Sequence, residues 1–157
     1  MSKRESIVPV VLSNLKRIWE EDMPFNKFLG VKLVSLDIGD VCVRIDMKEE
    51  LVGNSARGIL HGGVISSVLD LTGGVTAMTE ILKQMSGRSI EEIANRCTKA
   101  GTIDLRVDYL RPGEGQYFLA RASILHAGRR LAVARSEFRN DSDLLIAVGM
   151  GTYMIGA

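Results

Sequence analysis

The segment at residues 59–74, ILHGGVISSVLDLTGG, holds a single carboxylate, Asp70, among residues that are almost all apolar or small. The run from 62 to 83 is apolar almost all round, which is typical of a helix covered by other elements. A charged carboxylate in such a helix costs several kcal/mol unless it is ion-paired or hydrogen-bonded. Asp70 therefore has a structural partner, faces a solvent-filled slot or takes part in chemistry.

A seam of small and polar residues runs along the same predicted helix. Its members recur at spacings of four, three, four and three, at which helical residues share one face: Gly63, Ser67, Asp70, Gly74 and Ala77. Such a face suits the close approach of a second backbone, or a narrow channel. The competing interpretation is that serine and glycine fill a tight contact between the helix and a sheet.

The sequence His61-Gly62-Gly63 stands where this helix should begin. Backbone N–H groups at a helix start have no intrahelical partner, and the helix dipole favours negative charge there. The oxyanion formed when a thioester or ester carbonyl is attacked would be stabilised at that place, and glycine lets the substrate approach the amide. His61 is equally suited to the plain role of an N-cap or a loop residue.

The distance between these two features constrains the assembly. Gly62 and Asp70 are eight residues apart, which is about 12 Å of rise along one helix. Attack on a carbonyl needs reacting atoms within roughly 3.5 Å of each other. Two antiparallel copies of the helix meet this condition, because each supplies its glycine end to one site and its carboxylate to the other. If both residues act together, the protein is at least a twofold dimer with two shared sites.

The remaining sequence predicts the elements that position these residues. We expect an amphipathic helix over 5–22, a β-hairpin over 31–48, the buried helix over 62–83 and a short helix opened by the capping-box residues Ser89 and Glu92. Four extended runs follow, separated by turn signals, at 102–110, 117–125, 130–138 and 144–155.

Short connections between these runs imply antiparallel neighbours. In the first run an apolar face alternates without a fault, at Ile103, Leu105, Val107 and Tyr109. The predicted fold is α+β, with a curved antiparallel sheet wrapped around one long central helix. A chain of 157 residues suits one domain over 1–157. Within it we expect an N-terminal helical segment at 1–30 and a helical insert at 84–100.

Composition excludes several classes of protein. Lysine and arginine number 20 against 19 acidic residues. The protein therefore has no strong positive electrostatic field that would attract nucleic acid. No apolar stretch is long enough to span a membrane, and no cleavable leader is apparent, so we expect a cytoplasmic protein. Cys42 and Cys97 have no partners at metal-ligand spacing and suit a reducing compartment as small buried hydrophobes. No metal site is predicted.

The motifs taken jointly resemble a known family. They are G-x-x-H-G-G at 58–63 with an acidic residue nine positions after the histidine, MPFN at 23–26, VGN at 52–54, the LD pair at 69–70 and GTIDLRVDYLRPG at 101–113. This set resembles the hotdog-fold acyl-CoA thioesterases of the PaaI type, and within them the YigI-like subgroup. The resemblance implies a hotdog fold and the hydrolysis of a medium- to long-chain acyl-CoA to free acid and CoA, without a cofactor. It also implies a homo-oligomer, either a dimer or a dimer of dimers.

Carried over to this sequence, the resemblance implies roles for five residues. Asp70 would be the nucleophile or the general base, and the Gly62 amide would donate to the oxyanion. His61 would orient the thioester carbonyl and Asn54 would help to place the water. Thr102 would sit beside the carboxylate at the start of its strand. Asn54 is also a common turn residue.

Substrate-binding residues follow from the same resemblance and from chemistry. Gly63 and Ser67, on the small seam, are expected to line the substrate path. Arg111, Arg129 and Arg130 stand in turns and have the donor geometry for CoA phosphates, although basic turn residues are often merely solvated.

The acyl chain needs an apolar slot, for which Met78, Leu82 and Phe28 have the right chemistry, although core packing claims such residues more often. Two other functions stay open on the same fold: a non-catalytic sensor of acyl-CoA and a hotdog dehydratase. The retained Asp70 speaks against the sensor, and the absence of a proline-rich loop speaks against the dehydratase.

Overall fold

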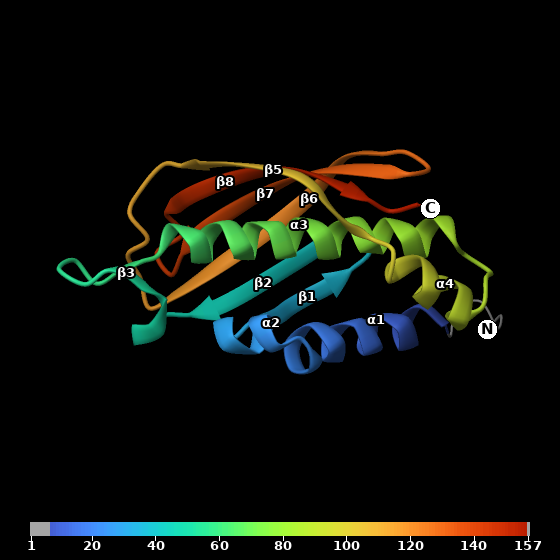
Figure 1. The fold of residues 1–157 in the computed structure, drawn as a ribbon, viewed down its shortest axis with the longest axis horizontal. Coiled ribbons are helices and arrows are strands. Elements are labelled where there is room, and N and C mark those ends of the chain that lie inside the picture. Colours follow the sequence, from blue (N-terminus) through green and yellow to red (C-terminus); the bar gives the residue numbers. More distant parts are fainter. Residues whose placement is uncertain (1–6, 157) are drawn as a thin grey trace.

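The computed structural model describes residues 7–156 and has the predicted α+β architecture, a curved antiparallel sheet around one long helix, α3 (Figure 1). The helical elements are α1 Ile7–Arg17, a π-helical turn Ile18–Asp22, α2 Pro24–Leu29, a 3-10 turn Glu49–Leu51, α3 Gly62–Gln84 and α4 Ile90–Cys97. The strands are β1 Lys32–Asp37, β2 Asp40–Asp46, β3 Val52–Asn54, β4 Ile59–Leu60, β5 Gly101–Tyr109, β6 Tyr117–Ala127, β7 Leu131–Asn140 and β8 Leu145–Met154.

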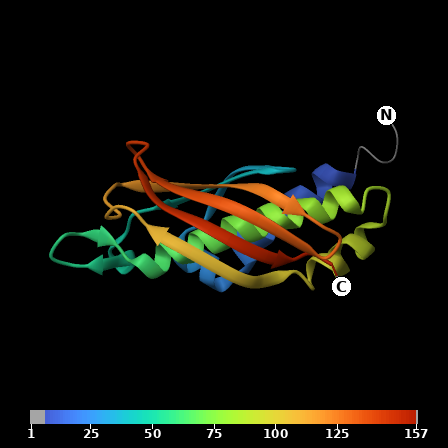
Figure 2. The same ribbon diagram turned by 90° about the horizontal axis from the view of Figure 1, so that it is seen from above.

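The main sheet has six strands in the order β1-β2-β6-β7-β8-β5, and all neighbours are antiparallel. Viewed from above, α3 runs beneath the strands while β5 forms one edge (Figure 2). Phe118 and Phe138, on adjacent strands, are fully buried with stacked rings 5.3 Å apart. They belong to one core cluster with Val68 and Leu69 of α3, so the sheet's concave face closes on the helix.

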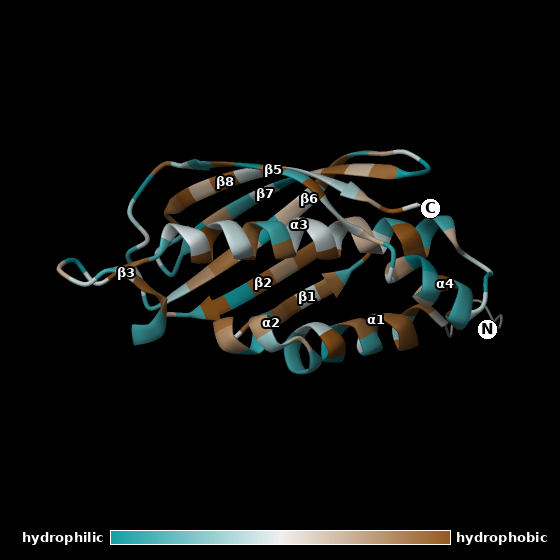
Figure 3. Ribbon diagram, in the orientation of Figure 1, coloured by the Kyte–Doolittle hydropathy of each residue, from teal (hydrophilic) through white to brown (hydrophobic). Residues whose placement is uncertain are grey.

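The N-terminal segment differs from the single helix predicted over 5–22. α1 ends at Arg17 and a π-helical turn follows, while residues 5 and 6 lie outside the described residues. α2 was not predicted; it begins at Pro24, whose fixed φ suits a first helical position, and it ends at Gly30 with φ 74°. Apolar and polar positions alternate along α1 (Figure 3), and Val11 and Leu15 are buried. This helix therefore covers the core with one face.

Other predictions are confirmed. The buried helix predicted over 62–83 is α3, and α4 opens with both hydrogen bonds of the capping box formed by Ser89 and Glu92. A two-stranded ribbon of β3 and β4 was missed, because each strand is only two or three residues long. None of the helices in residues 7–156 has the length and apolar character needed to cross a bilayer.

A notch between α3 and β8 holds the phenol of Tyr153. A Cβ added at Gly73 would lie 2.2 Å from the Tyr153 hydroxyl, and one added at Gly151 would lie 2.4 Å from it. The hydroxyl donates to the carbonyl of Asp70 at 3.2 Å, and burial raises the pKa of the phenol well above its usual range, aided by the nearby Asp70 carboxylate. Tyr153 thus fixes the turn of α3 that carries Asp70 to the sheet.

Replacing Gly73 with alanine should lower the free energy of unfolding by about 2 kcal/mol, because the new methyl group overpacks the notch. Gly74→Ala is the matched control, since its Cβ would meet Tyr153 at an ordinary 3.6 Å. Its greater helix propensity should leave stability unchanged or raise it by up to about 1 kcal/mol. Urea unfolding of both variants measures the difference, and equal losses would show that the notch is not tight.

Candidate active site

Asp70 is half-buried on α3, and its Oδ1 accepts a hydrogen bond of 2.9 Å from Thr102 Oγ1 at the start of β5. No lysine, arginine or histidine within residues 7–156 forms an ion pair with it. The carboxylate is therefore held by one neutral donor and keeps most of its acceptor capacity. A structural salt bridge does not explain its presence among these residues.

A β-bulge places Thr102 beside Asp70. Strict alternation would put Thr102 on the same face as Asp104, away from the helix. The register shifts between these two residues, so that Thr102 lies opposite Tyr153 and Asp104 lies opposite Thr152. Because Tyr153 faces α3, Thr102 faces it as well. The faultless alternation expected from Ile103 onward is thus wrong at its first position, where Ile103 is 53% exposed.

His61 is the N-cap residue of α3, and its Nδ1 accepts a hydrogen bond of 2.8 Å from the Gly63 N–H. A neutral imidazole in this arrangement carries its proton on Nε2, which leaves Nε2 as a donor. Side chains would not fit around this ring: a Cβ at Gly53 would lie 2.5 Å from the His61 Cα, and one at Gly63 would lie 2.9 Å from Nδ1. The glycines on both sides thus serve to seat the histidine.

The Gly62 amide is the donor left at this helix start. The Gly63 N–H donates to the imidazole of His61, and the N–H groups of Val64 and Ile65 donate to the His61 carbonyl. The Gly62 N–H has no acceptor among the described residues. Its own carbonyl accepts from the hydroxyl of Tyr109, at 3.0 Å, which ties the helix start to the far end of β5.

Two other predicted residues take local roles in the structure. Ser67 Oγ donates to the Gly63 carbonyl, one turn earlier in α3, at 2.7 Å. Asn54 is exposed, and both its Oδ1 and its backbone carbonyl accept from residues of the turn between β3 and β4. No hydrogen bond among the described residues links Asn54 to His61, Gly62 or Asp70. The structure therefore joins Asp70 with Thr102, and His61 with Gly63, at two separate places on α3.

The predicted arginines also separate into two groups. Arg111 follows β5 at the end where Tyr109 meets the start of α3, and it donates to the Leu145 carbonyl at 2.9 Å. Arg129 and Arg130 lie in the turn between β6 and β7, next to the other end of α3, because Gln84 donates to the carbonyl of Gly128. The three cannot act on one ligand within one protomer.

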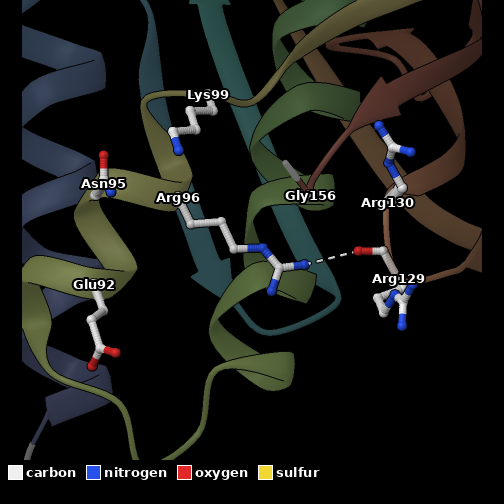
Figure 4. Close-up of a pocket in the computed structure, with 7 residues that line it drawn as sticks. All are labelled: Glu92, Asn95, Arg96, Lys99, Arg129, Arg130 and Gly156. Carbon is white, nitrogen blue, oxygen red and sulfur yellow. Dashed lines mark hydrogen bonds between the residues drawn. The ribbon is translucent and has the colours of Figure 1, made fainter.

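Sequence analysis missed two further cations beside this turn. A pocket of about 580 Å³ is lined by Arg96, Lys99, Arg129 and Arg130, with Glu92 as its only acidic residue (Figure 4). Arg96 is fixed there, because its guanidinium donates to the carbonyls of Ile155 and Arg129 at 2.7 and 3.0 Å. No sequence signal connects α4 to this turn, since the residues are more than thirty positions apart.

Comparisons with known proteins identify the family and the fold. Residues 57–147 match the sequence model described as the Thioesterase superfamily. The medium/long-chain acyl-CoA thioesterase YigI of Salmonella typhimurium is 44% identical over 134 residues, covering 85% of this chain and 86% of that protein.

Solved structures are similar over nearly the whole chain. A thioesterase-superfamily protein from Shewanella oneidensis is 44% identical with a TM-score of 0.93, covering 96% of this chain and 99% of that one. The crystal structure of a "putative thioesterase" from Syntrophus aciditrophicus is 38% identical with a TM-score of 0.84, covering 98% of this chain and 99% of that one. The predicted hotdog fold is thereby confirmed.

Proposed function

Because this chain belongs to the thioesterase superfamily, we propose that it is an acyl-CoA thioesterase that hydrolyses medium- to long-chain acyl-CoA to free acid and CoA. One observation carries the proposal: a carboxylate without an ion pair, Asp70, is presented from the central helix and oriented by Thr102. The similar YigI proteins bear the name of that activity. No metal or cofactor enters the proposed reaction, and we place the enzyme in the cytoplasm.

Asp70 acts on the thioester carbonyl in one of two ways. It attacks the carbon to form an enzyme anhydride that water then cleaves, or it takes a proton from the attacking water. In either case the C–S bond breaks, CoA leaves as the thiol and the acyl group leaves as the acid. The Thr102 hydroxyl donates to one carboxylate oxygen and so leaves the other oxygen aimed at the substrate.

The Gly62 amide is the proposed oxyanion donor, and it is supplied by the partner subunit. Within one protomer Gly62 and Asp70 lie eight residues apart on α3, a rise of about 12 Å. The edge strand β5 supports a dimer, because Ile103 and Tyr109 on it are 53% and 52% exposed and its outer edge has no partner strand among the described residues. We propose a twofold dimer, or a pair of such dimers, in which antiparallel α3 helices form two shared sites.

His61 and Asn54 complete the proposed site from the glycine end. The Nε2–H of His61 is free to donate to the thioester carbonyl, since its Nδ1 is engaged by Gly63. Asn54 has an amide group in the exposed turn nearby, and we keep the proposal that it helps to place water. Gly63 and Ser67 are the proposed lining of the substrate path, and Gly63 also holds His61 through a hydrogen bond.

The basic pocket is the proposed place for the CoA phosphates. Its four cations face one carboxylate, and guanidinium groups match phosphate oxygens. In an antiparallel dimer that brings Gly62 of one subunit to Asp70 of the other, Arg111 of the partner subunit would lie near Asp70. Arg129 and Arg130 lie next to Gln84, about 21 Å further along α3, so the basic pocket and Arg111 would be two separate places for contacts to CoA.

The variant Asp70→Asn should lose nearly all thiol release from acyl-CoA, measured with a thiol reagent, while it still binds ligand.

Gly62 permits a sharper test, because Gly62→Pro removes the amide proton at a first helical position that tolerates proline. It should lower kcat about a hundredfold. Gly62→Ala keeps the amide, and its Cβ meets Tyr109 at an ordinary 3.5 Å. Absent turnover in the wild type, with ligand binding intact, would favour the sensor instead.

A hybrid dimer of one Gly62→Pro subunit and one Asp70→Asn subunit should regain activity, because one of its two sites combines an intact amide with an intact carboxylate. Co-expression with two different tags isolates this hybrid. Its kcat per dimer should be about half that of the wild type. Activity no higher than that of the parent variants would rule out shared sites.

Replacing Arg130 with glutamine should raise KM for acyl-CoA about tenfold with little change in kcat, because a charge-assisted bond to phosphate is lost. The KM of the variant should also respond less to added salt. Arg121→Gln is the control, since Arg121 is an exposed arginine of β6 that forms an ion pair with Asp40 of β2. Steady-state kinetics at two salt concentrations measure both effects, and equal shifts in the two variants would exclude a specific phosphate contact.

A further inference from the structure

A small cavity lies next to the two residues, Thr102 and Tyr153, that are hydrogen-bonded to Asp70. Its volume is about 200 Å³, and Thr102, which donates to Asp70, is one of its walls. Gly74 and Ala77 of the small seam on α3 form another wall, so the cavity runs along the helix from Asp70 toward α4. Trp19 and Met23 cover it from the N-terminal segment. An acyl group bound at Asp70 has this space next to it.

A larger cavity of about 410 Å³ lies between α1, the π-helical turn and α4. Leu15 and Ile18 line it on one side, and Ile93, Ala94 and Cys97 of α4 line it on the other. The two cavities have three walls in common, namely Trp19, Met23 and Met78. A ligand that passes these side chains therefore reaches α4 from the catalytic carboxylate.

We propose that the two cavities form one chamber for the fatty acyl chain, with α4 as its far wall, and that this wall limits the length of chain accepted. The inference rests on the proposed function and adds to it the place of the chain. The chain belongs to the protomer that supplies Asp70, while the oxyanion donor comes from its partner.

The chemistry of the chamber fits an uncharged flexible chain. Most of its lining is apolar, and the guanidinium of Arg17 at its rim is engaged by Asp22 at 2.7 Å. Burial raises the pKa of the Cys97 thiol, so that this group stays neutral. Two of the three shared walls are methionines, whose unbranched side chains adapt to ligands of different length. The volumes are those of ordinary small-ligand sites.

Several walls of the chamber come from outside the residues that match the superfamily model. The superfamily match covers residues 57–147, whereas Leu15, Trp19 and Met23 precede it. The polypeptide forms a π-helical turn at Ile18–Asp22, which is wider than a turn of α-helix. Trp19 in this turn lines both cavities. The N-terminal segment thus supplies one side of the chamber, and α4, which lies within the matched residues, supplies the other.

Of the three residues predicted from the sequence to line the acyl-chain slot, two do not line these cavities. Met78 lines both cavities as expected. Leu82 instead lies in the core cluster with Val11 and Ile93, at 2% exposure. Phe28 is 52% exposed, and the ammonium group of Lys48 lies over its ring in a cation–π contact.

Trp19 allows direct observation of the chamber, because it is the only tryptophan of the chain. The non-hydrolysable thioether S-hexadecyl-CoA should change the emission of Trp19 in the full-length wild type. S-butyl-CoA, with the same CoA part, should change it less, since its short chain fills only the inner of the two cavities that Trp19 lines. An equal response to both ligands, or none to the longer one, would overturn the chamber.

Filling the outer cavity should change chain-length preference. For Ala94→Phe we expect the ratio of kcat/KM for palmitoyl-CoA over butanoyl-CoA to fall about tenfold, as expected when methylene groups lose their pocket. Glu91→Phe is the matched control, because Glu91 is exposed on the same helix and does not line the cavity. Its ratio should equal that of the wild type.

The outcomes separate the two proposals. Hydrolysis of both substrates with an unchanged ratio in Ala94→Phe would reject the chamber and leave the thioesterase proposal standing. If the wild type hydrolyses neither substrate but Trp19 responds to the long thioether alone, the proposed function fails and the chamber stands as a binding site.

Discussion

The hydrogen bond from Thr102 to Asp70 is the interaction on which the arrangement of the site depends. It joins the central helix to the edge strand at Asp70, a carboxylate in an apolar stretch of that helix. Two structural devices make it possible. The β-bulge at Ile103 turns Thr102 toward the helix, and the glycine notch lets Tyr153 hold the backbone of Asp70 against β8. Both devices determine where the carboxylate points, and the residues that they place, Thr102 and Tyr153, also line the small cavity of the proposed acyl chamber.

The same helix carries the second proposed catalytic feature, the Gly62 amide, at a place that its own carboxylate cannot reach. A straight helix keeps Gly62 and Asp70 about 12 Å apart, so the fold accommodates joint action of the two groups only by pairing with a second copy. The exposed apolar residues of β5 lie on the strand that connects both features, through Thr102 at one end and Tyr109 at the other. The exposed edge strand therefore agrees with the proposed division of the site between two subunits.

Local patterns in the sequence predict the regular elements well. Periodicity gives α3, capping chemistry gives α4, and alternation with turn signals gives the long strands. The π-helical turn, the bulge at Ile103 and the short strands β3 and β4 escape this reasoning, because tertiary contacts rather than local propensity decide them. Asp70 stands out as a charge in an apolar helix. The cations Arg96 and Lys99 do not, since only the folded chain brings them to Arg129 and Arg130.

The division between catalytic core and N-terminal segment has a physical consequence for specificity. Residues that position Asp70 pack tightly: Tyr153 fits its notch without room for a methyl group at Gly73. Residues that surround the proposed acyl chamber instead leave open volume between α1 and α4 and include flexible methionines. Substitutions in the outer walls of the chamber, on α1 and α4, therefore change the space for a ligand without moving the carboxylate. A fold built in this way can alter which chain it accepts while its chemistry stays the same.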